Sequence, residues 1–256
     1  MWHTRASELR RLGIIRPSVG LLLHGPPGTG KTALARAVAA DFHTVFIAVD
    51  LSAIVGAHIG ESERLFASVF CEARNAAPAV VFVDELDALF SGHGRVQAGA
   101  LQTRLTATLA AELDQCSDEL SEQLMLASSK SAKIFSGVNV IAATNVVMRI
   151  DPCLRAVGRL ESALSVGYPD WSARRSIAAQ IICNGLVYFV DDGVTADTIA
   201  NLTSFRTGAD IEAIMRYALS RAMISAGPNR SNRFEPVVTL DILRNAVVLY
   251  RHEYKS

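Results

Sequence analysis

A glycine-rich segment lies between an apolar run and an alanine-rich stretch, and this combination is compatible with few folds. Residues 25–32 read Gly-Pro-Pro-Gly-Thr-Gly-Lys-Thr, which matches the pattern GxxxxGK[ST]. The apolar run over 19–24 predicts a short buried strand, and the stretch over 32–40 predicts a helix. In this setting the glycines let backbone N–H groups close around an anionic phosphate, and the helix N-terminus adds its dipole. The sequence therefore predicts a phosphate-binding loop.

Two side chains of this loop have separate expected roles. Lys31 places a positive charge on the β- and γ-phosphates of a nucleotide, and the Thr32 hydroxyl can ligate Mg²⁺. The residues expected to bind the phosphates are Gly25, Pro26, Pro27, Gly28, Thr29, Gly30, Lys31 and Thr32.

Apolar runs that alternate with helical segments predict the first part of the architecture. Further strands are expected at 45–49, 79–83, 138–143 and 163–166, and further helices at 61–73 and 100–113. Continuous apolar strands separated by helices are typical of a parallel sheet that is covered on both faces. We therefore expect an α/β fold over 1–168, with a parallel five-stranded sheet and helices on both of its faces.

The remainder of the chain, 169–256, is expected to form a small α-helical lid domain. Its helices are expected at 171–183, 196–202, 209–224 and 239–250, and an extended connector at 186–190. Within the first domain, the serine-rich segment 116–137 predicts a polar surface insertion. It is interpreted either as a loop or as a segment whose apolar patch at 124–126 forms a short helix or a docking element.

The third expected strand ends in two acidic residues, Asp84 and Glu85. An acidic residue at the carboxyl end of a buried parallel strand lies on the edge of the sheet where ligands bind. Asp84 is therefore expected to hold Mg²⁺, and Glu85 is expected to orient and polarise the water that attacks a phosphate. Asp87 is interpreted as a helix N-terminal acid.

Composition excludes several classes of protein. Lysine plus arginine and aspartate plus glutamate each number 25, so the formal net charge is zero, whereas domains that bind duplex nucleic acid mainly through its phosphates are strongly basic. No apolar stretch approaches 18 residues, so we expect no membrane span. The four cysteines are scattered without a CxxC pair, which favours a reducing, cytoplasmic compartment.

Taken together, these motifs resemble the AAA family of ATPases. Residues 20–32 and 83–89 are similar to the family's two Walker motifs, and Ala-Ala-Thr-Asn at 142–145 is similar to its sensor-1 strand. The resemblance makes Asn145 the expected partner of the γ-phosphate and the attacking water. Thr-Gly-Ala-Asp at 207–210 resembles the start of the lid helix that closes over adenine, so Gly208 and Ala209 are expected to bind nucleotide.

Other segments extend the resemblance over nearly the whole chain. Residues 60–64 resemble the family's pore-loop region, and 151–152, 158–160 and 168–170 resemble its second region of homology. Within the family, the motifs are most similar to those of tandem-cassette proteins related to Cdc48 or of peroxisomal AAA proteins.

The resemblance implies a function and partners. It implies an ATPase that binds Mg²⁺ and ATP, assembles into a homo- or hetero-oligomeric ring, expected as a hexamer, and uses hydrolysis to unfold or remodel a protein substrate. No direct contact with nucleic acid is expected.

Departures from the family's pattern support an alternative. Members of the family usually carry two arginines that reach the neighbouring subunit's nucleotide. The second is kept here as Arg159, which is therefore an expected catalytic residue. The first position is occupied by Ala156, and Arg155 is displaced from it by one residue. His58 stands where the family has a pore-loop aromatic. The alternative is a slow or inactive nucleotide-binding structural subunit of a mixed AAA ring.

The start of the chain also departs from the family. Only 24 residues precede Gly25, and relatives have a longer preceding stretch that walls the adenine pocket. The expectation is either one cassette of a longer protein or a divergent stand-alone ATPase.

Overall fold

The structure is a computed structural model that describes residues 18–49, 51, 54, 61–90, 96–126, 137–183, 190–226 and 237–253. Its contacts divide the chain into two compact units. The first contains Met1–Gly25 and Lys31–Val166, and the second contains Pro26–Gly30 and Gly167–Ser256.

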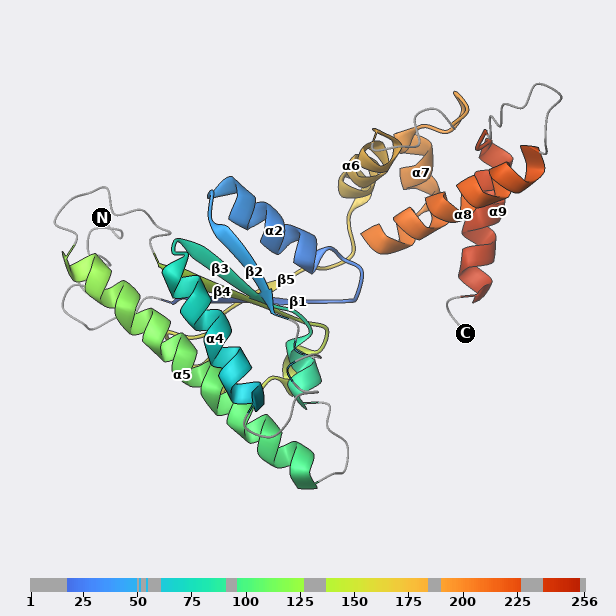
Figure 1. The fold of residues 1–256 in the computed structure, drawn as a ribbon. Coiled ribbons are helices and arrows are strands. Elements are labelled where there is room, and N and C mark those ends of the chain that lie inside the picture. Colours follow the sequence, from blue (N-terminus) through green and yellow to red (C-terminus); the bar gives the residue numbers. More distant parts are fainter. Residues whose placement is uncertain are drawn as a thin grey trace. The chain divides into compact units, whose positions relative to one another are not determined.

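The first unit is built on a five-stranded sheet (Figure 1). Its strands are β1 (Gly20–His24), β2 (Val45–Val49), β3 (Ala79–Val83), β4 (Val138–Thr144) and β5 (Ser162–Ser165). Their order across the sheet is β2-β3-β4-β1-β5, and every neighbouring pair is parallel. The expected parallel five-stranded α/β fold is therefore confirmed.

Helices cover both faces of this sheet (Figure 1). α2 (Lys31–Asp41) lies on one face, and α4 (Glu61–Asn75) and α5 (Val96–Leu126) lie on the other. All five side chains of β3 are buried, which explains its unbroken apolar sequence. Successive side chains of a strand point to opposite faces, so Phe82 packs in the cluster with α2 whereas Val81 packs in the cluster with α4 and α5.

The length of α5 differs from expectation. The helix runs to Leu126, so the first half of the segment predicted as a polar surface insertion is helical. Cys116 and Ser117 are 2% and 1% exposed, and Leu120 packs against the core. The Ser121 hydroxyl donates to the Ser117 carbonyl at 2.7 Å. The Ser121 hydroxyl is thus accommodated within the helix by bonding one turn back.

Three short 3₁₀ helices follow the carboxyl ends of strands β3 and β4. They are η1 (Leu86–Phe90), η2 (Val147–Arg149) and η3 (Pro152–Arg155). Because β3, β4 and β1 are adjacent and parallel, the residues that follow their last positions meet at one edge of the sheet.

The described residues of the second unit are mostly helical after residue 170. It contains α6 (Trp171–Ile181), α7 (Ala196–Leu202), α8 (Gly208–Ala226) and α9 (Leu240–Glu253). Buried side chains of all four helices form one apolar cluster, among them Ala178, Ile199, Ile214 and Leu243.

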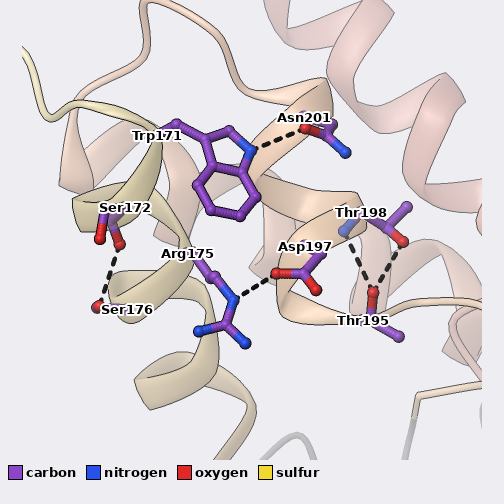
Figure 2. Close-up of polar contacts among 8 residues, drawn as sticks. All are labelled: Trp171, Ser172, Arg175, Ser176, Thr195, Asp197, Thr198 and Asn201. Carbon is purple, nitrogen blue, oxygen red and sulfur yellow. Dashed lines mark hydrogen bonds and ion pairs between the residues drawn. The ribbon is translucent and has the colours of Figure 1, made fainter.

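Polar contacts join α6 to α7 on the outside of that cluster (Figure 2). The Trp171 indole N–H donates to Asn201 Oδ1 at 2.8 Å, and Arg175 forms an ion pair with Asp197. The Thr195 hydroxyl caps α7 by accepting a hydrogen bond from Thr198 N.

Several expected features lie outside the described residues. These are His58 and the start of the pore-loop resemblance at 60, the part of the serine-rich segment over 127–136, and most of the connector at 186–190. In the described part of the chain, no helix is both long and apolar enough to cross a membrane.

Candidate functional site

The glycine-rich segment links β1 to α2, and its backbone geometry demands glycine. Gly25 has φ 148°, and a Cβ built there would lie 2.1 Å from the Val166 carbonyl oxygen. Gly28 has φ 76°, and its Cβ would lie 2.8 Å from Thr207 Oγ1. A side chain at either position would be strained by both its backbone conformation and its neighbours. Pro27, Gly28 and Gly30 are exposed.

Hydrogen bonds fix parts of this segment. The Thr29 hydroxyl donates to the Pro26 carbonyl at 2.9 Å. The Gly25 N–H donates to the Thr144 carbonyl at 3.3 Å, which continues the contact between β1 and β4 beyond the last strand residue. The segment therefore leaves the sheet in a defined conformation.

Lys31 joins the start of α2 to the end of β4. Its side chain is buried, with 8% of the residue exposed, and its Nζ donates to the Gly25 carbonyl at 2.9 Å and to Asn145 Oδ1 at 2.8 Å. Burial lowers the pKa of Lys31 below its ordinary value, although the carboxylates of Asp84 and Asp87 act in the opposite direction. The ammonium group is thus held next to Asn145 and near the carboxylates of Asp84 and Asp87.

Thr32 and Asp84 also meet at this edge. The Thr32 hydroxyl donates to Asp84 Oδ2 at 2.7 Å, and Asp84 Oδ1 accepts a hydrogen bond from Glu85 N at 2.9 Å. A hydroxyl and a carboxylate are the oxygen donors that Mg²⁺ prefers, and this ion is usually held by one or two protein groups together with substrate phosphates and water. The pair therefore fits Mg²⁺ bound to a nucleotide.

A self-sufficient metal centre is a different kind of site. Among the residues described, no group of three or more His, Cys, Asp or Glu side chains comes together in a way that could hold a metal ion.

Glu85 has an unusual backbone for its residue type. Its φ is 49°, in the left-handed region, and the residue is exposed. A non-glycine residue in such a conformation costs about 1–3 kcal/mol and persists where the surrounding structure enforces it, often at functional sites. The hydrogen bond from Glu85 N to Asp84 and the start of η1 directly after it are the local constraints.

Asp87 has a role in the structure that its sequence position does not reveal. It lies in the first turn of η1, as expected of a helix N-terminal acid. Its Oδ1 also accepts hydrogen bonds from the Thr144 hydroxyl at 2.7 Å and from Asn145 N at 3.2 Å. The Thr144 oxygen in turn accepts from Val146 N at 3.1 Å. Asp87 therefore positions the end of β4 that carries Asn145. Its place within the 83–89 segment, three residues after Asp84, is a signal in the sequence that could have indicated such a role.

Arg159 does not join these groups in the structure. Its Nε and one terminal nitrogen donate to the two carboxylate oxygens of Asp114 at 2.8 and 2.7 Å, and its other terminal nitrogen donates to the Cys153 carbonyl at 2.7 Å. The hydrogen bond with Asp114 raises the pKa of Arg159 above its ordinary value. The neighbouring Arg155 and Ala156 are exposed.

Gly208 and Ala209 lie in the second unit, at the first turn of α8. The Ala209 N–H donates to the Gly28 carbonyl, which belongs to the same unit, at 3.2 Å. Thr207 and Asp210 bond reciprocally across this turn, because Thr207 N donates to Asp210 Oδ2 at 2.9 Å and Asp210 N donates to Thr207 Oγ1 at 3.2 Å. This reciprocal pair is a capping box.

Comparison with known proteins places these features in a family context. The family model described as "ATPase family associated with various cellular activities (AAA)" matches residues 21–168. A cell division cycle protein 48 homolog from Archaeoglobus fulgidus is 36% identical over 246 residues, which is 95% of this chain and 31% of the relative. A proteasome-activating nucleotidase from Aeropyrum pernix is 36% identical over 238 residues, which is 93% of this chain and 52% of the relative.

A mouse relative, a nuclear valosin-containing protein-like protein, is 38% identical over 213 residues, which is 82% of this chain and 23% of the relative. The chain thus spans less than a third of the length of the Archaeoglobus and mouse relatives.

Proposed function

This chain belongs to the AAA family of ATPases, and we propose that it binds ATP with Mg²⁺ and hydrolyses the nucleotide at the carboxyl edge of its sheet. The observation that carries the proposal is the meeting of Lys31, Asn145 and the Thr32–Asp84 pair at that edge. Lys31 and Thr32 lie at the start of α2, and Asp84 and Asn145 directly follow β3 and β4. Each of these side chains can bind a phosphate or its metal ion.

The proposed reaction is attack of water on the terminal phosphate. Phosphoryl transfer depends on positioning and on stabilising the charge of the phosphate oxygens. Lys31 stabilises that charge, and Glu85 orients and polarises the water. The water oxygen bonds to the γ-phosphorus while the bond from that phosphorus to the bridging oxygen breaks. The water gives up one proton to the solvent, and ADP and inorganic phosphate are released. Mg²⁺, when held by Thr32 and Asp84, supplies further positive charge to the phosphate oxygens.

Ring assembly and a protein substrate are part of the proposal. Family membership supports a homo- or hetero-oligomeric ring, expected as a hexamer, in which hydrolysis drives the unfolding or remodelling of a protein partner. In such a ring, Arg159 would act on the nucleotide of the neighbouring subunit, and it would first have to leave Asp114. A cytoplasmic location, argued above from the cysteines, belongs to the same proposal.

Glu85→Gln tests the catalytic assignment. We expect the variant to retain ATP binding while turnover falls at least tenfold, because the amide cannot polarise water as the carboxylate does. Binding is measured with a fluorescent ATP analogue, and turnover by phosphate release. Glu212→Gln on the exposed face of α8 is the matched control. Unchanged turnover in Glu85→Gln would remove Glu85 from the mechanism.

A second candidate function is a slow or inactive nucleotide-binding structural subunit of a mixed ring. It is favoured by the bidentate contact between Arg159 and Asp114, together with Ala156 in place of the first family arginine. A steady-state ATPase assay across protein concentrations separates the two candidates. Activity that rises with assembly supports the motor, whereas tight nucleotide binding without turnover supports the structural subunit.

A further inference from the structure

Asp210 connects two helices that are far apart in the sequence. Its Oδ2 accepts from Thr207 N within the capping box at the start of α8. Its other oxygen, Oδ1, accepts a hydrogen bond from the Tyr250 hydroxyl at 2.9 Å, and Tyr250 lies near the end of α9, 40 residues later. The carboxylate is therefore shared between the α8 turn and α9.

The surroundings of this contact hold it in place. The guanidinium of Arg206 lies over the Tyr250 ring, 5.6 Å from its centroid, and Arg206 and Thr207 are only 7% and 6% exposed. Burial acts to raise the pKa of Asp210, but hydrogen bonds from Thr207 and Tyr250 and the charge of Arg206 outweigh it, so this pKa lies below its ordinary value. Asp210 thus remains an ionised acceptor for both helices.

The turn that Asp210 caps is the turn that contacts the glycine-rich loop within the second unit. Ala209 N donates to the Gly28 carbonyl, and Thr207 Oγ1 and Ala209 Cβ lie 2.8 and 2.9 Å from where a Cβ of Gly28 would be. A shift of this turn by a few tenths of an ångström would therefore alter its contact with Gly28.

We propose that Tyr250 is a positioning residue, which holds the 207–210 turn against Gly28 through Asp210 and thereby sets the affinity of the chain for nucleotide. The inference rests on the proposed function, because it assigns a consequence for nucleotide binding to a contact made by α9. Tyr250 itself touches no nucleotide in this scheme.

Tyr250→Phe tests the contact, because it removes the hydroxyl and keeps the ring beneath Arg206. Tyr217→Phe is the matched control: Tyr217 is also half-buried in the second unit and also lies beneath an arginine, Arg221, at 5.9 Å. The first readout is hydrogen exchange of the Ala209 and Asp210 amides without nucleotide. We expect exchange at least threefold faster in Tyr250→Phe and unchanged in Tyr217→Phe.

The second readout is nucleotide binding and turnover. We expect Tyr250→Phe to raise the Kd of a fluorescent ATP analogue and the KM for ATP by threefold to tenfold while kcat stays within twofold. Exchange and affinity that match the wild type, or equal shifts in both tyrosine variants, would overturn the proposal. A wild-type chain that binds no nucleotide would overturn the proposed function instead, and the exchange comparison would still decide whether Tyr250 holds the turn.

Discussion

Removal of the Asp87 carboxylate should destabilise the first unit and slow hydrolysis. In Asp87→Ala, the Thr144 hydroxyl, in a residue that is 1% exposed, loses its acceptor, while Asn145 N is exposed and can bond water instead. A buried donor left unsatisfied costs about 1–3 kcal/mol. We therefore take about 2 kcal/mol as the loss in the free energy of unfolding. For a unit of this size, that corresponds to a melting temperature lower by about 4–8 °C.

The same variant should affect catalysis through Asn145. Asp87 holds the end of β4, and Asn145 in turn accepts a hydrogen bond from Lys31. A loss of about 1.4 kcal/mol in transition-state stabilisation lowers the rate tenfold, so we expect kcat to fall by about that factor. Thermal unfolding by circular dichroism and phosphate release measure the two effects.

Asp87→Asn is the control for this prediction, because its carbonyl oxygen can still accept from the Thr144 hydroxyl. We expect it to lose about half as much stability as Asp87→Ala. If Asp87→Ala melts at the wild-type temperature, or if both variants are equally destabilised, the assigned role of the Thr144 contact is refuted.

Two further predictions concern titratable groups. Burial raises the pKa of the Cys116 thiol from 9.0 to about 11, so at pH 8 its thiolate fraction is about one hundredth of that of an ordinary cysteine. Iodoacetamide should therefore alkylate exposed Cys71 and Cys183 in the folded chain but spare Cys116. Equal labelling of the three cysteines, measured by mass spectrometry, would contradict this prediction. Because the pKa of Asp210 is lower when folded than its ordinary value of about 4, its contribution to stability is fully present above that value and is lost as the pH falls below it. The melting temperature of the wild type should therefore drop more steeply below pH 4 than that of Asp210→Asn, and parallel curves would count against the assigned contacts.

Sequence reasoning predicted much of the fold because its signals are local. An unbroken apolar run such as β3 needs only its neighbours in the chain to be recognised, and its five buried residues confirm the prediction. Gly25 and Gly28 likewise indicate a tight loop, and both have the positive φ values that favour glycine. The resemblance to the AAA family follows from such motifs and is confirmed by the family match.

The length of α5 could not be predicted in the same way. Its serines favour a loop by local preference, but Arg74 of α4 pairs with Glu112 and Glu119, two turns apart on one face of the helix. Burial of Cys116 and Ser117 then favours continued helix over a surface loop. Tertiary packing overrides local preference here.

The glycine-rich loop, the acidic end of β3 and the α/β order of elements can be predicted from the sequence, because each depends on residues that are close in the chain. The side chains that these groups meet are set by the tertiary fold. It placed Thr144 beside Asp87 across 57 residues, Arg159 on Asp114 across 45, and Tyr250 on Asp210 across 40. Such partners depend on how strands align and helices pack, and neither composition nor spacing encodes that alignment in a form that can be read along the chain.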